Sequence, residues 1–159
     1  MKLNGFTLIE LVVVIVVLAI LAIVAAPKFI GLSTEARIEA INQIQASTKT
    51  ANSLVYAKSQ MANLTTQAVS GRSDLLDIDV DGDGNIDTRL LRGYLDNTDI
   101  EKWLDLDDIF VIEYQGIHFT YIGYDDNGNG RVSDDLCYFR YQQANETSKP
   151  QYTTTETGC

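Results

Sequence analysis

A long apolar run near the N-terminus dominates the hydropathy pattern of the chain. From Phe6 to Ala26 the residues are almost all aliphatic, and Glu10 is the only ionisable side chain among them. As an α-helix rising 1.5 Å per residue, this run would be roughly 32 Å long, close to the thickness of the hydrocarbon core of a bilayer. The pattern therefore predicts a membrane-spanning helix over residues 6–26, with a carboxylate near its start that requires a functional explanation.

After Pro27 the pattern changes from uniformly apolar to amphipathic. Hydrophobic residues recur at helical spacing, and polar residues fall mostly on the opposite face. The expected buried face carries Ile41, Ile44, Ala51, Val55 and Ala62, and the expected polar face carries Asn42, Gln45, Lys49, Asn52 and Ser59. We predict that the helix continues through residues 27–59 and packs its apolar stripe against a head domain formed by residues 60–159.

The head shows the shorter patterns of a small α+β domain. Residues 61–77 are polar and are expected to form a connecting loop. Thr98-Asp99-Ile100-Glu101 matches a capping box, which predicts a short helix. Residues 109–114, 117–124 and 136–141 are rich in β-branched and aromatic side chains, which predicts three strands, with a hairpin turn at Gln115-Gly116. The expected fold class is α+β, a long N-terminal α-helix packed on a small antiparallel β-sheet.

Two acidic, glycine-containing loops have the spacing of an EF-hand-like calcium loop. Oxygen-bearing side chains at alternate positions turn toward one centre, as a hard cation with six to eight oxygen ligands requires. The first loop offers Asp79, Asp81, Asp83, Asn85 and Asp87, and the second offers Asp125, Asn127, Asn129, Arg131, Asp134 and Asp135, with Asn85 and Arg131 acting through backbone carbonyls. We predict up to two Ca²⁺ sites; the alternative is a pair of turns with solvated acids.

Neither loop has the glutamate that normally closes such a site at position 12. That position is Leu90 in the first loop and Leu136 in the second, so the closing ligand must come from elsewhere. Asp134 or Asp135 could close the second loop. For the first loop, Asp96 and Asp99 are candidates only because they lie nearby in the sequence.

Composition narrows the class of partner and of activity. Because 12 basic residues face 22 acidic ones, the formal net charge is −10, which argues against nucleic acid as a partner of the head. The single histidine, His118, lies in a predicted strand, and no serine or cysteine has a recognisable activating neighbourhood. We therefore predict no catalytic residues and no enzymatic function.

The first ten residues carry a family resemblance. Met1-Lys2-Leu3-Asn4 followed by Gly5-Phe6-Thr7-Leu8-Ile9-Glu10 resembles the class III signal of type IV pilins and type II secretion pseudopilins. The resemblance implies that a prepilin peptidase removes residues 1–5 as a leader peptide by cutting between Gly5 and Phe6, and that Phe6 is then N-methylated. It also implies that Glu10 pairs with the N-terminal amine of a neighbouring subunit, which would relieve two unpaired charges at once.

Three stretches of the predicted long helix, residues 6–59, resemble one subgroup of type IV pilins more specifically. Ala25-Ala26-Pro27-Lys28-Phe29-Ile30, Glu35-Ala36-Arg37 and Ala51-Asn52-Ser53-Leu54-Val55-Tyr56-Ala57-Lys58 resemble the stalk of mannose-sensitive haemagglutinin (MSHA) type pilins. This implies the type IV pilin ladle fold and a single-pass precursor in the bacterial inner membrane. The pilus assembly machinery of that membrane would polymerise the precursor into a helical homo-oligomer, an extracellular pilus that serves attachment.

The sequence leaves other functions open. A type II secretion pseudopilin or a minor pilin would carry the same signal. A membrane-tethered calcium-dependent binding module that never polymerises would keep the anchor and the acidic loops. An ordinary secretory signal peptide or a simple anchor would leave Glu10 unexplained.

Both cysteines of the chain, Cys137 and Cys159, lie close to the C-terminus. In an exported chain oxidation is expected, so we predict a disulfide between them that ties down a polar tail. The resemblance implies the same pairing, because many type IV pilins close a C-terminal loop with a disulfide. Two free thiols are the alternative.

Overall fold

A single helix of 52 residues, α1 (Leu8–Ser59), forms the N-terminal part of the protein. The computed structural model describes residues 7–62 and 64–159, apart from the side chains of residues 25–32. The helix is continuous through Pro27 and ends at Ser59, where the sequence analysis places its end. The chain divides into two units, one before and one after the junction between Arg37 and Ile38.

Residues 6–26 are the segment expected to span a membrane. Phe6 and the side chains of residues 25 and 26 lie outside the description. Across the part of the chain that the structure describes, no helix is both long enough and apolar enough to cross a membrane.

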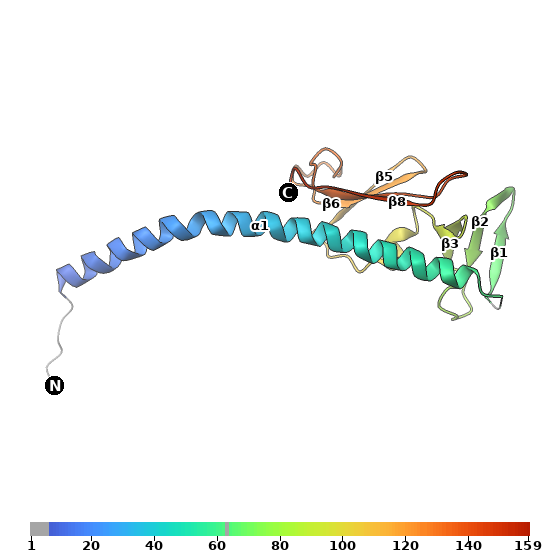
Figure 1. Ribbon diagram of the computed structural model, residues 1–159, viewed down its shortest axis with the longest axis horizontal. Coiled ribbons are helices and arrows are strands. Elements are labelled where there is room, and N and C mark those ends of the chain that lie inside the picture. The colour runs from blue at the N-terminus through green and yellow to red at the C-terminus, as the bar shows by residue number, and fades with distance from the viewer. Residues whose placement is uncertain (1–6, 63) are drawn as a thin grey trace, which may run out of the picture. The chain divides into compact units, whose positions relative to one another are not determined.

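The C-terminal unit contains two four-stranded antiparallel sheets where one small sheet was expected (Figure 1). The first sheet consists, in spatial order, of β1 (Thr66–Val69), β2 (Arg72–Ile78), β3 (Thr88–Leu91) and β4 (Tyr94–Leu95). The second consists of β5 (Val111–Gln115), β6 (Phe119–Gly123), β7 (Tyr138–Gln142) and β8 (Gln151–Thr155). Within this unit, the second sheet lies alongside the part of α1 that follows Arg37, and the first lies near the C-terminal end of the helix. The α+β class and the long N-terminal helix are confirmed.

Three strands and a short helix match the sequence-based expectations. The strands predicted over residues 109–114, 117–124 and 136–141 are β5, β6 and β7, and each begins two residues later than predicted. The short helix is η1 (Ile100–Trp103), a 3₁₀-helix. The predicted capping box is wrong, because Asp99 is the N-cap residue and makes no side-chain cap hydrogen bond.

Residues 61–77 are not the connecting loop that was predicted, since they contain β1 and nearly all of β2. Most β1 side chains are exposed, so the strand lacks the alternation of apolar and polar positions that marks a half-buried strand. A turn with Gly71 at φ +76° joins it to β2. The polar C-terminal tail also forms a strand, β8, in which Thr153–Thr155 and the two residues before them pair with β7 across the whole length of that strand.

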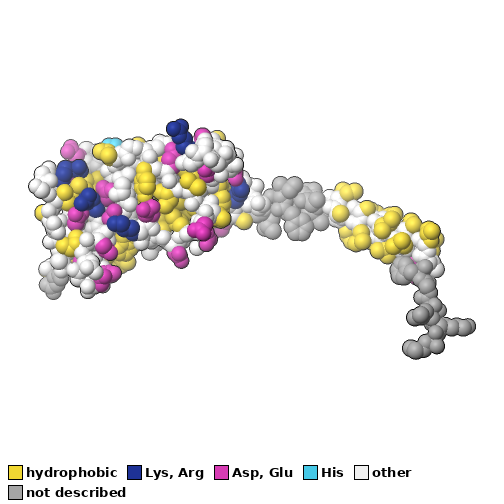
Figure 2. Space-filling model, turned by 180° about the vertical axis from the view of Figure 1, so that it is seen from behind, with side chains coloured by type: hydrophobic (Ala, Val, Ile, Leu, Met, Phe, Trp, Pro, Cys, Tyr) yellow, Lys and Arg dark blue, Asp and Glu magenta, His cyan; other side chains and the backbone are white. Residues whose placement is uncertain are grey.

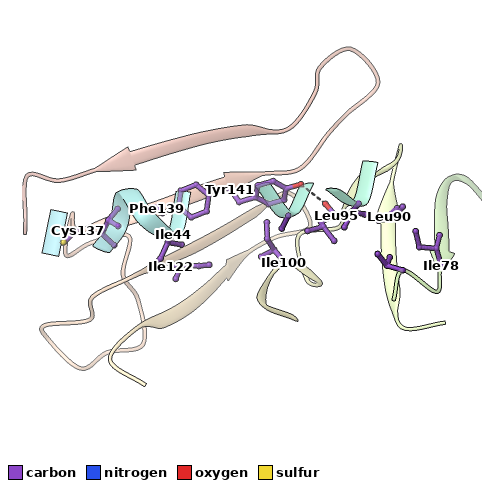
Figure 3. Packing of buried hydrophobic residues seen from close by; sticks show 13 residues of the cluster. Ile44, Ile78, Leu90, Leu95, Ile100, Ile122, Cys137, Phe139 and Tyr141 are labelled. Atoms are coloured by element: carbon purple, nitrogen blue, oxygen red, sulfur yellow. Dashed lines mark hydrogen bonds between the residues drawn. The ribbon is translucent and has the colours of Figure 1, made fainter. Parts of the chain in front are cut away.

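The apolar stripe of α1 packs into the core of the C-terminal unit. Four of the five predicted positions, Ile41, Ile44, Ala51 and Val55, are buried there. Ala62 is exposed, because the helix ends before it. Figure 3 shows the buried side chains in one row that runs from Cys137 at one end to Ile78 at the other, so that both sheets share a single core.

Asn52 is buried in this core, although the sequence analysis places it on the polar face. Its Oδ1 atom accepts a hydrogen bond from the backbone N–H of Leu95 at 2.9 Å. Leu95 belongs to β4, the edge strand of the first sheet. This bond occupies an N–H group at the edge of the sheet and satisfies the buried oxygen of Asn52, whereas Asn52 Nδ2 is buried without a hydrogen-bond partner among the described residues.

Candidate functional site

The predicted processing signal leads directly into the first turn of α1. Gly5 and Phe6 lie outside the described residues. Glu10 Oε2 accepts hydrogen bonds from the backbone N–H of Thr7 at 3.0 Å and from its hydroxyl at 2.9 Å, and the Glu10 N–H donates to the Thr7 hydroxyl at 3.3 Å. This reciprocal arrangement is a capping box, which satisfies backbone donors at the helix start. The Thr-x-x-Glu spacing at residues 7–10 is the sequence signal for this capping box.

The side chains around Glu10 form an apolar surface that the described residues leave exposed. Each large hydrophobic residue from Leu8 to Val24 is at least 43% exposed. Figure 2 shows this stretch as an almost continuous hydrophobic surface, whereas acidic and basic side chains are spread over the C-terminal unit. A helix that is apolar all round is normally covered by lipid or by other protein. This surface therefore needs a partner outside the chain.

The first acidic loop joins β2 to β3 and folds around Asp79. The carboxylate of Asp79 is buried and accepts hydrogen bonds from the backbone N–H groups of Gly82 at 2.7 Å and Gly84 at 2.9 Å. Asp81 and Asp83 each accept a hydrogen bond from the amide two residues further along the chain. One carboxylate oxygen from each of these three aspartates lies within 4.8 Å of the others. The structure thus brings together three of the predicted ligands.

Three carboxylates at this spacing repel one another unless positive charge compensates them. Hydrogen bonds from the side-chain and backbone amides of Asn85 lower the pKa of Asp83 from its usual value, so this group is ionised at neutral pH. Lys58, in the last turn of α1, donates to the backbone carbonyl of Val80 at 2.6 Å and ties the loop to the helix. The oxygen-only donor set fits a hard divalent cation such as Ca²⁺.

Asp87 lies outside this cluster, and the two suggested closing residues are engaged elsewhere. The backbone carbonyl of Asp87 accepts a hydrogen bond from Lys102 Nζ at 2.8 Å. Asp99 is buried, accepts a hydrogen bond from the Arg89 N–H and lies 3.2 Å from the Lys102 ammonium. Asp96 caps the turn before η1 through its Oδ1 atom. These contacts tie residues 87–102 together without supplying a closing carboxylate to the first loop.

The second acidic loop, between β6 and β7, repeats the same turn pattern. The carboxylate of Asp125 accepts hydrogen bonds from the backbone N–H groups of Asn129 at 3.1 Å and Gly130 at 2.8 Å. Asn129 Oδ1 accepts one from the Arg131 N–H at 2.7 Å, and Asn127 Oδ1 accepts one from the Asn129 N–H at 3.0 Å. The predicted backbone-carbonyl role of Arg131 stays a prediction.

Two aspartates close this loop through the asparagine side chains. Asn127 Nδ2 donates to Asp135 Oδ1 at 2.9 Å, and Asn129 Nδ2 donates to Asp134 Oδ2 at 2.9 Å. The second oxygen of Asp135 is buried and has no hydrogen-bond partner among the described residues. A buried carboxylate oxygen without a partner is unfavourable, so it favours a positive group beside it. Among the described residues, the carboxylates of this loop do not converge as Asp79, Asp81 and Asp83 do, so the unpaired oxygen of Asp135 is what favours a cation here.

The predicted disulfide between Cys137 and Cys159 is confirmed, with Cα atoms 4.8 Å apart. Cys137 comes directly after the second loop and is fully buried in the core. His118 was predicted to lie in a strand, but it is exposed in the turn between β5 and β6, just before β6 begins.

Comparison with protein families finds one match, at the N-terminus. Residues 1–26 match the family described as the prokaryotic N-terminal methylation motif. The chain carries a type IV pilin-like prepilin signal. No curated protein and no solved structure matches the chain. The signal supports a type IV pilin-like or pseudopilin precursor that undergoes prepilin peptidase processing, while the closeness to MSHA-type pilins stays a prediction.

Proposed function

We propose that this chain is the structural subunit of a type IV pilus, an MSHA-like major pilin. The precursor sits in the bacterial inner membrane, is cut between Gly5 and Phe6 by prepilin peptidase, and is N-methylated on Phe6. The inner-membrane assembly machinery then polymerises it into a helical, extracellular filament that attaches to surfaces. The methylation motif supports a structural role rather than catalysis.

The observation that carries this proposal is the uncovered apolar surface of α1 directly after the signal. Leaving a large aliphatic side chain in water costs about 1.5–3 kcal/mol relative to burying it, so a surface made of many of them requires a cover. More than a dozen such side chains between Leu8 and Val24 are exposed in the isolated chain. Lipid can cover them in the precursor, and the same helices of neighbouring subunits can cover them in a filament. One surface thus serves both stages.

Glu10 sets the register in this proposal. Its carboxylate is exposed and already accepts hydrogen bonds from Thr7, so the helix holds it at a defined place near the chain start. By resemblance, the amine of a neighbour's methylated Phe6 binds it. Because either charge alone is costly away from water, only the register that pairs them is favourable.

The test compares two substitutions of Glu10 in cells. Glu10→Ala removes the charge and the cap, whereas Glu10→Gln removes the charge but keeps a side chain that can complete a capping box. We expect both variants to be processed and methylated, by mass spectrometry, and both to lack sheared filaments in electron microscopy. Filaments of normal yield from Glu10→Gln would contradict the ion pair, and unprocessed wild-type protein would contradict the pilin assignment.

Both acidic loops are calcium sites in this proposal. Asp79, Asp81 and Asp83 would hold one cation, and Asp125, Asn127, Asn129, Asp134 and Asp135 the other. Bound Ca²⁺ would supply the positive charge that the clustered carboxylates lack. The affinity suits extracellular calcium, since the charge count is modest and the loops are exposed.

Thermal unfolding of the purified full-length protein in detergent micelles tests the calcium sites. With Ca²⁺ at about a hundred times Kd, each site raises the free energy of unfolding by about 2.7 kcal/mol. Two double variants should each lose the calcium-dependent stabilisation of one site. They are Asp81→Asn with Asp83→Asn for the first loop, and Asp125→Asn with Asp135→Asn for the second. Asp107→Asn with Asp108→Asn, at exposed acids outside the loops, is the matched control. Equal melting temperatures with calcium and with chelator would refute both sites.

A type II secretion pseudopilin is the second candidate, favoured by the aspartate cluster of the first loop. The resemblance implies that major pseudopilins use calcium in the head. Processed and methylated wild-type protein that remains in the cell envelope without surface filaments would support this candidate or a minor pilin. The disulfide favours the pilus, because the resemblance implies such a C-terminal loop for pilins.

A further inference from the structure

The end of the second acidic loop lies against the C-terminal tail of the chain. Gly158 N–H donates a hydrogen bond to the carbonyl of Leu136 at 2.9 Å. A Cβ atom at position 158 would lie 1.8 Å from the backbone carbonyl oxygen of Asp135. Only glycine therefore allows the tail to approach Asp135 this closely.

The disulfide fixes this contact from the adjacent residues. Cys159 follows Gly158, and Cys137 follows Leu136, so the Cys137–Cys159 bond joins the two segments one residue beyond their hydrogen bond. Cys137 is anchored in the core, at one end of the row of buried side chains in Figure 3. Its carbonyl also accepts a hydrogen bond from the Tyr124 N–H at 3.1 Å, immediately before the loop begins. Both ends of the loop are thus held at Cys137.

The backbone between Asp135 and Cys137 is held in an unfavourable conformation. Leu136 has φ +60°, in the left-handed region that residues with a Cβ rarely adopt, although its side chain is 45% exposed and is not held by the core. Such a conformation persists only where its surroundings impose it. The contacts that hold this segment include the Gly158 hydrogen bond, the disulfide and the Tyr124 hydrogen bond to Cys137.

We propose that the tail Gly158–Cys159 is a structural part of the second calcium site and positions Asp135 as its closing ligand. The inference rests on the proposed calcium binding of this loop. It selects Asp135 over Asp134, because Asp135 carries the buried, unpartnered oxygen and contacts the tail, whereas Asp134 is exposed. Gly158, Cys137 and Cys159 do not bind the cation themselves in this proposal. They are positioning residues that hold Asp135 in place.

This arrangement couples the disulfide to the cation. If reduction weakens calcium binding by some factor, calcium must disfavour reduction by the same factor, because linkage is reciprocal. A tenfold coupling corresponds to about 30 mV in the potential of the two-electron disulfide couple. A merely structural tail would leave the potential unchanged by calcium once the fold is intact.

The first experiment measures Ca²⁺ affinity by calorimetry on the full-length protein in micelles. The Asp81→Asn, Asp83→Asn background isolates the second loop. There we expect at least a tenfold rise in Kd when a dithiol reduces the disulfide. In the Asp125→Asn, Asp135→Asn background, which isolates the first loop, Kd should change less than twofold. Circular dichroism confirms that the reduced protein remains folded.

A second variant keeps the disulfide intact and so separates positioning from folding. Gly158→Ala should raise the Kd of the second loop at least tenfold, because its Cβ displaces Asp135. Thr157→Ala, one residue earlier and exposed, is the matched control and should not change Kd. Intact mass verifies the disulfide in both variants.

The outcomes distinguish the two levels of the hypothesis. Equal affinities in oxidised, reduced and Gly158→Ala proteins would overturn the coupling while leaving the calcium site in place. Absence of binding by the oxidised second loop would overturn the calcium assignment itself, and the inference with it. A disulfide potential that shifts with Ca²⁺ in the wild type but not in Asp135→Asn would support the role of Asp135 directly.

Discussion

Replacing Tyr141 with phenylalanine removes one hydroxyl from the centre of the core and tests how the two sheets are joined. Tyr141, in β7, is fully buried, and its hydroxyl donates to the backbone carbonyl of Leu95, in β4, at 2.7 Å. Losing this bond costs about 1 kcal/mol, and leaving the buried carbonyl without that donor adds a similar amount. Because the ring remains, no large cavity forms. We expect the free energy of unfolding to fall by about 2 kcal/mol.

Urea and thermal unfolding of the full-length protein in micelles measure this change. A loss of this size lowers the Tm by roughly 6–10 °C for a unit of this length. Tyr138→Phe is the matched control, since Tyr138 lies on the same strand but is only half-buried, and its stability should change by less than about 0.5 kcal/mol. If Tyr141→Phe were no less stable than Tyr138→Phe, the hydrogen bond between the sheets would contribute nothing.

The pH dependence gives a second readout of the same group. Burial raises the pKa of Tyr141 well above its usual range, and burial also raises the pKa of Tyr152 to about 12. Above pH 10 the unfolded chain releases tyrosine protons that the folded chain retains, so stability falls as the pH rises through that range. Tyr141 alone contributes up to about 1.4 kcal/mol per pH unit there. The decline between pH 10 and 11 should therefore be shallower in Tyr141→Phe, and equal slopes would contradict this account.

Three further expectations concern contacts away from Tyr141. In a double-mutant cycle, the exposed Arg89–Asp77 pair should show a coupling of about 0.5 kcal/mol, and a value above about 2 kcal/mol would contradict its exposure. Reducing the disulfide, which spans 22 residues, in calcium-free buffer should lower the free energy of unfolding by about 3 kcal/mol in urea titrations, and unchanged stability would be inconsistent with the loop-closure model. Gly93→Ala should destabilise more than Gly71→Ala in thermal melts, because both have positive φ but only Gly93 lies against the Tyr56 ring, and equal losses would argue against that contact.

Sequence patterns predicted the elements that local spacing or composition indicates. The buried positions of α1 recur at helical spacing, and β5 to β7 are rich in β-branched and aromatic side chains, although only β7 alternates in burial. The hairpin of β3 and β4 was missed, because its turn places Arg92 at φ +56° and nothing in a lone arginine indicates that conformation. Asn52 was assigned to the wrong face, because its partner Leu95 lies 43 positions away and no local pattern reports such a contact.

In the two acidic loops as well, contacts between near neighbours in the sequence were predictable and long-range contacts were not. The convergence of Asp79, Asp81 and Asp83 follows from their alternate spacing and from amides two to five residues away, so the sequence predicted it. The position of Asp87 depends on contacts with residues well beyond the loop, including Lys102. The surroundings of Asp135 depend on a glycine 23 positions later in the chain. Long-range contacts of this kind become visible only in the folded chain.

The continuity of α1 has a mechanical consequence. The helix whose N-terminal turns carry the exposed apolar surface also supplies Ile41, Ile44 and Val55 to the core. A tensile load on α1 is therefore resisted where Ile41, Ile44 and Val55 pack into the core. Pulling the helix out of the head requires breaking these packing contacts and the hydrogen bond between Asn52 and β4 at the same time. The head therefore acts as a tensile anchor for the helix.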